Sequence, residues 1–408
     1  MRNIVTLGLA LLLLSCQNKT SIGITEGHWL GQLDTMDGEK LPFNFKVIKN
    51  DSGVPIIEIY NAEEVITVDE IEFFKDSILI KLPVFEGYLK GALGKTAITG
   101  SFIKESVART VPFTAVFNQK ERFTTTKTPV QNVSGVWETV FNPTDETKYI
   151  AKGIFKQEGT SVTGTFRTTT GDYRYLEGVM HGDSIKLSTF DGAHAFLFTA
   201  RVTDSTMTGT FYSGNHSKEI FTAKRNERYE LPDENSLTYL KEGFEKLSFS
   251  FPDSNDTMVS LEDPQFKNKV VLVQIMGTWC PNCLDETKFL VNYLSQHTHP
   301  DLKIVGLAFE TAKTKALAFK SINRLKERIG VNYPILLAQY GTSNKVKAQE
   351  KLPMLDHIIS YPTTIFIDKK GIVRKIHTGF NGPATGENYV KFKNDFQDFV
   401  ALLLQEEI

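Results

Sequence analysis

The chain has 408 residues, a length that predicts two or three domains at about 150 residues each. Hydrophobic residues make up 41% and charged residues 23%, proportions that exclude a disordered or fibrous chain. The 46 basic residues nearly balance the 48 acidic ones, which argues against a nucleic-acid-binding protein. The three cysteines, Cys16, Cys280 and Cys283, are too few for a disulfide-stapled scaffold.

The N-terminus has the pattern of an export signal. Arg2 precedes a mostly apolar run of about ten residues, too short for a bilayer span of about 20. Residues 13–16, Leu-Leu-Ser-Cys, resemble the lipobox of bacterial lipoproteins. This resemblance implies a signal peptide over residues 1–15, lipidation of Cys16, and a tether over residues 16–23 that holds the protein at a membrane of the cell envelope. The alternative is an ordinary signal peptide that contains a cysteine.

The first half of the chain predicts antiparallel β-structure built from two copies of one unit. Residues 24–120 and 130–226 are rich in Thr, Phe, Val and Gly, with strand-like runs separated by turn dipeptides. Four short matches recur in order at offsets of about 108 residues: 27–29 with 135–137, 76–78 with 183–185, 99–102 with 208–211, and 113–115 with 221–223. We therefore predict two duplicated meanders, as barrels or sandwiches with separate cores or one shared core.

One tryptophan lies at the same position of each copy, Trp29 and Trp137. We predict that both are core residues, and the alternative is that they form the floor of a ligand cavity. This half contains no cysteine and no cluster of His, Asp and Glu at metal-ligand spacing. Its sequence therefore indicates a fold but no chemistry.

Residues 227–247 are polar and rich in turn-forming residues, and they are predicted to be a linker. Within the linker, Leu237, Leu240 and Phe244 are spaced on one helical face, so a short helix over residues 235–246 is expected.

From residue 248 to residue 408 the pattern changes to alternating strands and helices. The apolar run at 270–276 predicts a central strand buried on both faces, and Cys-Pro-Asn-Cys follows it at the start of a helix. The other predicted elements are a strand at 303–308, a helix at 311–329, a strand at 334–337, a hairpin of 363–367 and 372–376, and a helix at 387–404.

This order resembles the thioredoxin fold, and in particular the membrane-associated TlpA/ResA-like thiol–disulfide oxidoreductases. The resemblance rests on residues 279–283 (Trp-Cys-Pro-Asn-Cys), the strand before them, and residues 361–364 (Tyr-Pro-Thr-Thr). The additional helix and strand between 311 and 356 match an insertion typical of that branch. The expected fold is thus an all-β N-terminal half followed by an α/β thioredoxin-like domain at 248–408.

The position of the two cysteines predicts disulfide exchange on chemical grounds as well. The reacting species is the thiolate, which unpaired N–H groups and the dipole at a helix N-terminus stabilise. Cys280 stands just before the helix, and Pro281 suits its first position because a proline lacks the N–H that is unneeded there. Cys283 lies one turn further on. We predict that Cys280 attacks the substrate disulfide and that Cys283 resolves the mixed disulfide.

Two other readings of the cysteine pair are weaker. A structural zinc site needs four ligands, and no second Cys-x-x-Cys pair exists in the sequence. A peroxiredoxin has threonine three residues before its peroxidatic cysteine, where this chain has Gly277. We therefore expect neither a metal nor a cofactor.

Further site residues follow from the resemblance. Glu286 occupies the place of an acid that could relay a proton to the buried thiol, and the alternative is a glutamate favoured there by the helix dipole. Pro362 matches the family's cis-proline, which implies that its backbone pairs with the substrate chain. Trp279 is expected to cover the disulfide. Gln274 stands where thioredoxins carry a buried acid, which leaves Glu286 as the expected proton-handling group.

The sequence thus predicts an envelope thiol–disulfide oxidoreductase whose substrates are protein disulfides. The family implies a reductase supplied by a membrane donor of the DsbD/CcdA kind, with cytochrome c maturation or envelope repair as its setting, and Cys16 as its contact with the bilayer. A disulfide oxidase or isomerase using the same site is one alternative. The other is a binding lipoprotein in which the β half carries the main role.

Overall fold

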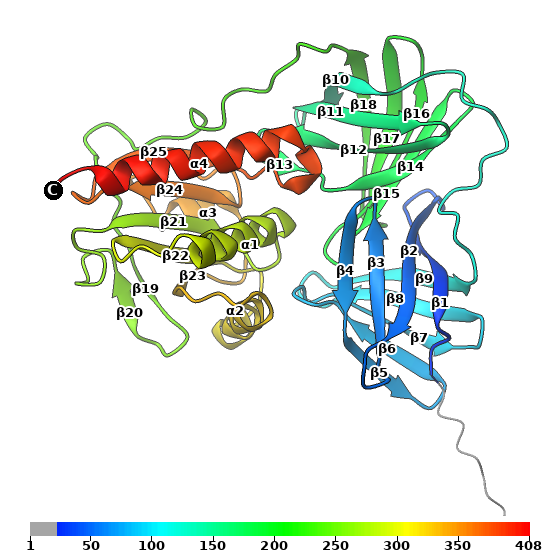
Figure 1. Ribbon diagram of the computed structural model, residues 1–408, viewed down its shortest axis with the longest axis horizontal. Helices are drawn as coiled ribbons and strands as arrows, with labels where there is room; N and C mark the ends of the chain where they lie inside the picture. The colour runs from blue at the N-terminus through cyan, green and yellow to red at the C-terminus, as the bar shows by residue number, and fades with distance from the viewer. Residues whose placement is uncertain (1–22) are drawn as a thin grey trace, which may run out of the picture.

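The computed structural model describes residues 23–408, which form two β-units followed by an α/β domain (Figure 1). The proposed signal peptide and Cys16 lie outside the described residues. Within residues 23–408, none of the helices combines the length and the apolarity that a membrane span requires.

The first β-unit is a nine-stranded antiparallel sheet in the order β4-β3-β2-β1-β9-β8-β7-β6-β5. The strands are β1 (Gly27–Asp34), β2 (Lys40–Lys49), β3 (Pro55–Asn61), β4 (Glu64–Val68), β5 (Glu70–Phe74), β6 (Ser77–Lys81), β7 (Tyr88–Leu93), β8 (Ala97–Lys104) and β9 (Arg109–Phe117). Side chains alternate between buried and partly exposed along β2 and β3, as in a sheet with one face in a core.

The second β-unit repeats this meander and closes it. Its order is β11-β10-β18-β17-β16-β15-β14-β12-β13, and an additional pairing of β11 with β12 completes a barrel. The strands are β10 (Gly135–Phe141), β11 (Tyr149–Glu158), β12 (Ser161–Thr168), β13 (Gly171–Asp172), β14 (Leu176–His181), β15 (Ser184–Phe190), β16 (Ala195–Val202), β17 (Thr206–Ser213) and β18 (Ser217–Arg225). The predicted all-β duplication is confirmed, with barrel-like sheets.

The two tryptophans occupy equivalent places in the two units. Trp29 and Trp137 are both fully buried in their respective cores. Each indole N–H donates to the backbone carbonyl four residues earlier, Thr25 or Val133, at 2.9 Å. The prediction that they are core residues is confirmed, and neither side chain is available to line a ligand cavity.

The two β-units interlock through Phe190 at the end of β15. Its fully buried ring packs in the core of the first unit, with its centroid 4.4 Å from that of Phe43. Its backbone N–H and C=O both bond the side chain of Asn61, at 3.2 and 3.0 Å. The units therefore have separate cores that are joined by shared side chains at one end.

The α/β domain has a five-stranded sheet in the order β23-β22-β21-β24-β25. Strands β21–β23 are parallel, and β24 and β25 form an antiparallel hairpin against β21. The elements are β21 (Val270–Met276), α1 (Pro281–Gln296), β22 (Leu302–Phe309), α2 (Lys315–Ile329), β23 (Ile335–Gln339), α3 (Lys345–Gln349), β24 (Thr363–Ile367), β25 (Val373–Thr378), the 3₁₀ turn η1 (Pro383–Thr385) and α4 (Glu387–Gln405). The predicted strands, hairpin and main helices are confirmed, and β21 is buried along its whole length.

A small two-stranded sheet, β19 (Ser250–Pro252) with β20 (Met258–Ser260), precedes this domain. The helix expected over residues 235–246 is wrong, because this segment is extended and turn-forming. Its backbone groups bond the α/β domain instead: Leu240 forms a β-bridge with Leu355, and Lys241 N donates to Met354 O at 2.8 Å. Gly243 has φ +87°, which interrupts a helix.

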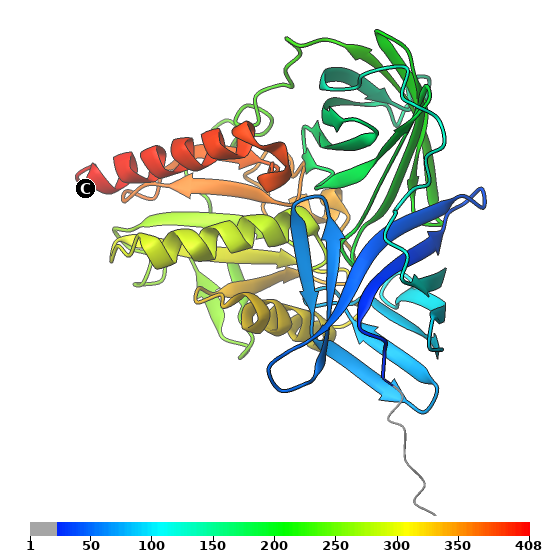
Figure 2. The same ribbon diagram turned by 45° about the vertical axis from the view of Figure 1, so that its right-hand side comes forward.

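The first β-unit also packs on the α/β domain. Val84 and Phe85, in the β6–β7 loop, belong to the hydrophobic core of the α/β domain. On α2, Arg324 donates to a carboxylate oxygen of Glu70 at 2.7 Å and to Leu82 O at 2.8 Å. The three units converge near the N-terminal ends of α1 and α4, beside β13 (Figures 1 and 2).

Candidate active site

Cys280 occupies the N-cap position of α1, at the carboxyl end of β21. Its backbone is extended (φ −98°, ψ 116°), and Pro281 takes the first helical position, where no N–H is required. The Cys280 Sγ accepts a hydrogen bond from Cys283 N at 3.3 Å and donates one to Tyr361 O, also at 3.3 Å. The helix N-terminus therefore directs an N–H group at this sulfur, as a thiolate nucleophile requires.

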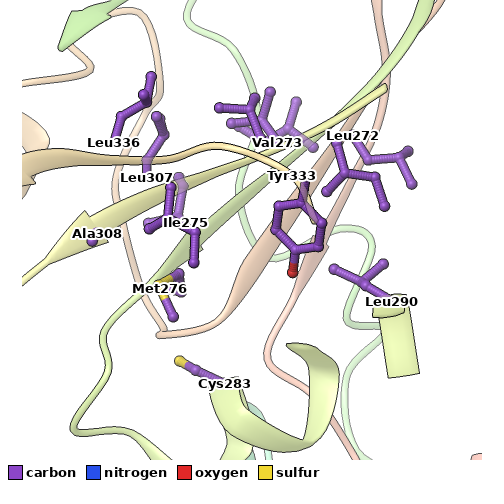
Figure 3. Close-up of a cluster of buried hydrophobic side chains, with 14 of the residues drawn as sticks. Leu272, Val273, Ile275, Met276, Cys283, Leu290, Leu307, Ala308, Tyr333 and Leu336 are labelled. Atoms are coloured by element: carbon purple, nitrogen blue, oxygen red, sulfur yellow. The ribbon is translucent and has the colours of Figure 1, made fainter. Parts of the chain in front are cut away.

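Cys283 lies one helical turn deeper and is inaccessible to solvent. Its side chain borders the buried cluster of Met276, Ile275 and Leu290 (Figure 3). Burial raises the pKa of its thiol well above the usual range, and the contact with Cys280 raises it further. Both cysteines are unbridged thiols in the structure. The accessible sulfur is thus Cys280, at 7% exposure, and the buried one needs a base in order to react.

A buried acid lies next to Cys283. Glu286 is 2% exposed, and its carboxylate accepts hydrogen bonds from Gln274 Nε2 and Thr364 Oγ1, each at 2.8 Å. Burial raises the pKa of Glu286 to about 7, although these two hydrogen bonds act in the opposite direction. Gln274, which replaces the buried acid of thioredoxins, is therefore a direct partner of Glu286.

The loop before β24 faces the nucleophile. The Tyr361–Pro362 peptide bond is cis, as the sequence predicts, and it places the Tyr361 carbonyl against Cys280. The Trp279 indole N–H donates to Phe309 O at 2.9 Å, and its ring meets the Tyr361 ring edge-on at 5.5 Å. The structure thus brings together all five residues predicted for this site: Trp279, Cys280, Cys283, Glu286 and Pro362.

A second buried acid, Glu310, was not predicted from the sequence. It follows β22 directly, and its carboxylate accepts hydrogen bonds from Thr278 N at 2.8 Å and Thr278 Oγ1 at 2.7 Å. Burial raises its pKa to about 7. Its bonds hold the turn that leads into the Cys-Pro-Asn-Cys motif, and no local motif marks it in the sequence.

The second β-unit docks directly on the motif. Asn282, between the two cysteines, donates from Nδ2 to Asp172 O at 3.1 Å and to Phe380 O at 3.3 Å. Gly171 has φ +137°, and a Cβ there would lie 2.0 Å from Asn282 Nδ2, so only glycine fits. The Asp172 carboxylate in turn accepts the Gly382 N–H. The loop at 379–387 therefore borders the site.

Arg174, next to this docking loop, joins all three units. Its guanidinium pairs with Glu64 of the first β-unit, with Asp191 of the second, and with Asp285 on α1. Its side chain is 4% exposed, and it also donates to Pro281 O at 3.3 Å. Burial raises the pKa of Glu64. Burial also acts to raise the pKa of Asp191, but His194 and Arg174 outweigh it and lower that pKa.

The site opens into a cleft of about 600 Å³ between the β-units and the α/β domain. Cys280, Asn282 and Tyr361 line one side, and Lys104 and Tyr173 of the β-units line the other. The sequence placed the redox motif correctly but assigned the β half no part in the site. The turn signal at Gly171-Asp172 indicates a turn and does not identify its partner.

Comparison with known proteins gives a family match within this domain. Residues 245–376 match the AhpC/TSA family. The thioredoxin-like protein YneN of Bacillus subtilis is 26% identical over 140 residues, which cover 34% of this chain and 73% of YneN. The thiol–disulfide oxidoreductase ResA of the same organism is 27% identical over 141 residues, covering 34% and 69%.

The thiol:disulfide interchange protein DsbE of Escherichia coli K12 is 28% identical over 125 residues, covering 31% of this chain and 58% of DsbE. Among solved structures, a thiol–disulfide oxidoreductase from Bacteroides fragilis is 13% identical and aligns with a TM-score of 0.28, covering 36% of this chain and 99% of that one.

Proposed function

Because the C-terminal domain is a TlpA/ResA-like thioredoxin domain of the thiol–disulfide oxidoreductases, we propose that the protein reduces protein disulfides through Cys280 and Cys283. The observation that carries this proposal is the position of the Cys280 sulfur at the N-terminus of α1. This sulfur accepts a hydrogen bond from the Cys283 backbone N–H and faces the Tyr361 carbonyl. Nucleophile, resolving thiol and a backbone edge for the substrate all lie within one small region.

The reaction proceeds in two exchanges. The Cys280 thiolate attacks one sulfur of the substrate disulfide, and the bond between the two substrate sulfurs breaks as a mixed disulfide forms. The departing substrate thiolate takes up a proton. Cys283 then attacks the Cys280 sulfur, which releases the second substrate thiol and leaves a Cys280–Cys283 disulfide. Two electrons have passed to the substrate, and a dithiol donor must return them before the next cycle.

The neighbouring groups fit roles in these steps. The Tyr361–Pro362 backbone, on the accessible side of Cys280, would pair with the substrate chain and align its disulfide. Trp279 would cover the sulfur on one side and limit its contact with water. Glu286 would accept the proton of the Cys283 thiol as that thiol attacks.

We further propose that the protein works in the cell envelope, held at a membrane by a lipid on Cys16. An exported compartment is kept oxidising, so a reductase there needs a membrane donor of dithiols, of the DsbD/CcdA kind. A lipid anchor would keep the enzyme beside such a donor. The support for this part is the lipobox-like sequence at residues 13–16.

The direction of electron flow is tested by the reduction potential of the Cys280–Cys283 couple, measured by equilibration with glutathione buffers. We expect a value well below about −120 mV, the potential of the strong oxidant DsbA. Such a value means that the dithiol form donates electrons readily. A potential near that of DsbA would contradict the reductase and favour the oxidase.

The role of Glu286 predicts a change in the pH profile. With a pKa of about 7, Glu286 becomes an effective base as the pH rises through neutrality. In Glu286→Gln we expect resolution of the mixed disulfide to slow by about 100-fold at pH 8, and its rise with pH around 7 to disappear. Stopped-flow measurement of substrate thiol release across pH 5.5–9 would report both changes.

Glu310→Gln is the matched control. It removes a buried acid with the same raised pKa of about 7, but the hydrogen bonds of this acid go to Thr278. We expect this variant to retain the inflection near pH 7. An unchanged profile in Glu286→Gln would show that another group takes the proton.

A further inference from the structure

The cleft beside Cys280 has a cationic wall contributed by the first β-unit. Lys104, at the end of β8, and Arg109, at the start of β9, line it together with Lys345 from α3. Asp172 is the one carboxylate side chain among the lining residues of the described chain, and the Arg174 and Gly382 N–H groups already bond it. The cleft therefore presents more cationic side chains than carboxylates to a ligand.

These cations are not neutralised by close ion pairs. Among residues 23–408, no carboxylate lies within 4.0 Å of the charged nitrogens of Lys104, Arg109 or Lys345. The Lys104 Nζ donates to a backbone carbonyl, that of Ala193, at 3.2 Å. Exposed lysines are often unpaired, but Lys104 is partly buried, where an uncompensated charge is costly.

The pKa shifts of the groups in this cleft also indicate a positive electrostatic potential. Burial lowers the pKa of Lys104, and the nearby Arg109 lowers it further, while Glu86 and Asp191 act in the opposite direction. Burial also lowers the pKa of His216, another lining residue, to about 4, and Arg109 and Lys104 contribute to the decrease. His216 is therefore neutral at pH 7, and the positive charge of the wall comes from the lysines and the arginine.

We propose that this cleft binds an acidic segment of the substrate polypeptide, next to the cysteine that Cys280 attacks. The inference rests on the proposed function and adds a substrate class to it. Lys104, Arg109 and Cys280 line one continuous cleft, so a chain whose disulfide reaches the Cys280 sulfur passes along the cationic wall. Carboxylates there would pair with otherwise uncompensated cations, which selects acidic partners and speeds their encounter.

The test compares two disulfide-linked peptides of equal length, one with three glutamates beside the cysteine and one with three glutamines. We expect the wild-type protein to reduce the acidic peptide with at least a tenfold higher kcat/KM at low salt. In Lys104→Gln/Arg109→Gln this preference should fall below threefold, because the rate on the acidic peptide falls more than the rate on the glutamine peptide. In the wild-type protein, 0.5 M NaCl should weaken the preference by screening.

Lys95→Gln/Lys224→Gln is the matched control, because it removes the same charge from exposed residues that do not line the cleft. It should keep the full preference. Equal wild-type rates on both peptides would overturn the inference while leaving the reductase intact. An equal loss on both peptides in the cleft variant would also overturn it, since the cations would then act on the thiolate. If wild-type protein reduces neither peptide, the proposed function itself fails.

Discussion

Cys280→Ser should abolish disulfide reduction, whereas Cys283→Ser should stop after the first exchange and accumulate a mixed disulfide. The asymmetry follows from burial: Cys280 lines the cleft, whereas Cys283 has no solvent exposure and lies against Cys280. Incubation with a peptide disulfide followed by non-reducing mass spectrometry should show one peptide bound per Cys283→Ser chain and none on Cys280→Ser.

Both variants are best made in a Cys16→Ala background, which leaves the redox pair as the only cysteines of the chain. Cys16→Ala alone should turn over the peptide in solution at the rate of the unaltered protein. Full turnover by Cys283→Ser would contradict the two-thiol mechanism. A peptide adduct on Cys280→Ser would reverse the assignment of nucleophile and resolving thiol.

The redox motif could be predicted from the sequence because its determinants are local. A seven-residue strand that is apolar except for Gln274, a Cys-Pro-Asn-Cys sequence and a helical pattern follow one another closely, so their order fixes how the cysteines meet the helix terminus. The same holds for the Tyr361–Pro362 turn that opens the β24–β25 hairpin.

Contacts between the units could not be predicted, because they join residues far apart in the sequence. Asn282 donates a hydrogen bond to Asp172 O, 110 residues away in the sequence. Arg174 pairs with Glu64 of the first β-unit and with Asp285 of the α/β domain. In the linker, a predicted local element, the helix over residues 235–246, does not form. Its apolar spacing suits a helix, but pairing of Leu240 with Leu355 satisfies the backbone in an extended form.

The candidate active site is therefore built by all three units and not by the α/β domain alone. The second β-unit supports Asn282 and α1, while the first contributes the Lys104 wall and places Phe85 in the core of the α/β domain. A duplicated β-unit at this position limits how substrates approach Cys280.

Arg174→Ala should reduce the free energy of unfolding by about 3–5 kcal/mol, the cost of leaving buried charges without a partner. Arg174 is the shared cation of three carboxylates, Glu64, Asp191 and Asp285, all at most 13% exposed. The loss can be followed by urea unfolding with tryptophan fluorescence. The chain has three tryptophans, one in each unit (Trp29, Trp137 and Trp279), so variants that keep a single tryptophan can follow the units separately.

The loss should depend on pH in a defined direction. Without Arg174, Glu64 and the neighbouring Asp172 hold their protons to higher pH, since burial already raises the pKa of Glu64 and raises that of Asp172 to about 6, and Arg174 acts against both shifts. Below their pKa values Glu64 and Asp172 are neutral in the folded state, so the deficit relative to wild type should be smaller near pH 5 than at neutral pH. It should grow as the pH rises to 8, because folding then requires either burying negative charge or retaining protons.

Arg201→Ala is the control within the same β-unit, since Arg201 pairs with Asp183 at the surface and is 79% exposed. Its stability should remain close to that of wild type across this pH range. If Arg174→Ala behaves like Arg201→Ala, the junction does not depend on its buried cation. If Trp279 alone changes while the other two tryptophans unfold as before, the arginine holds the α/β domain against the β-units without stabilising them.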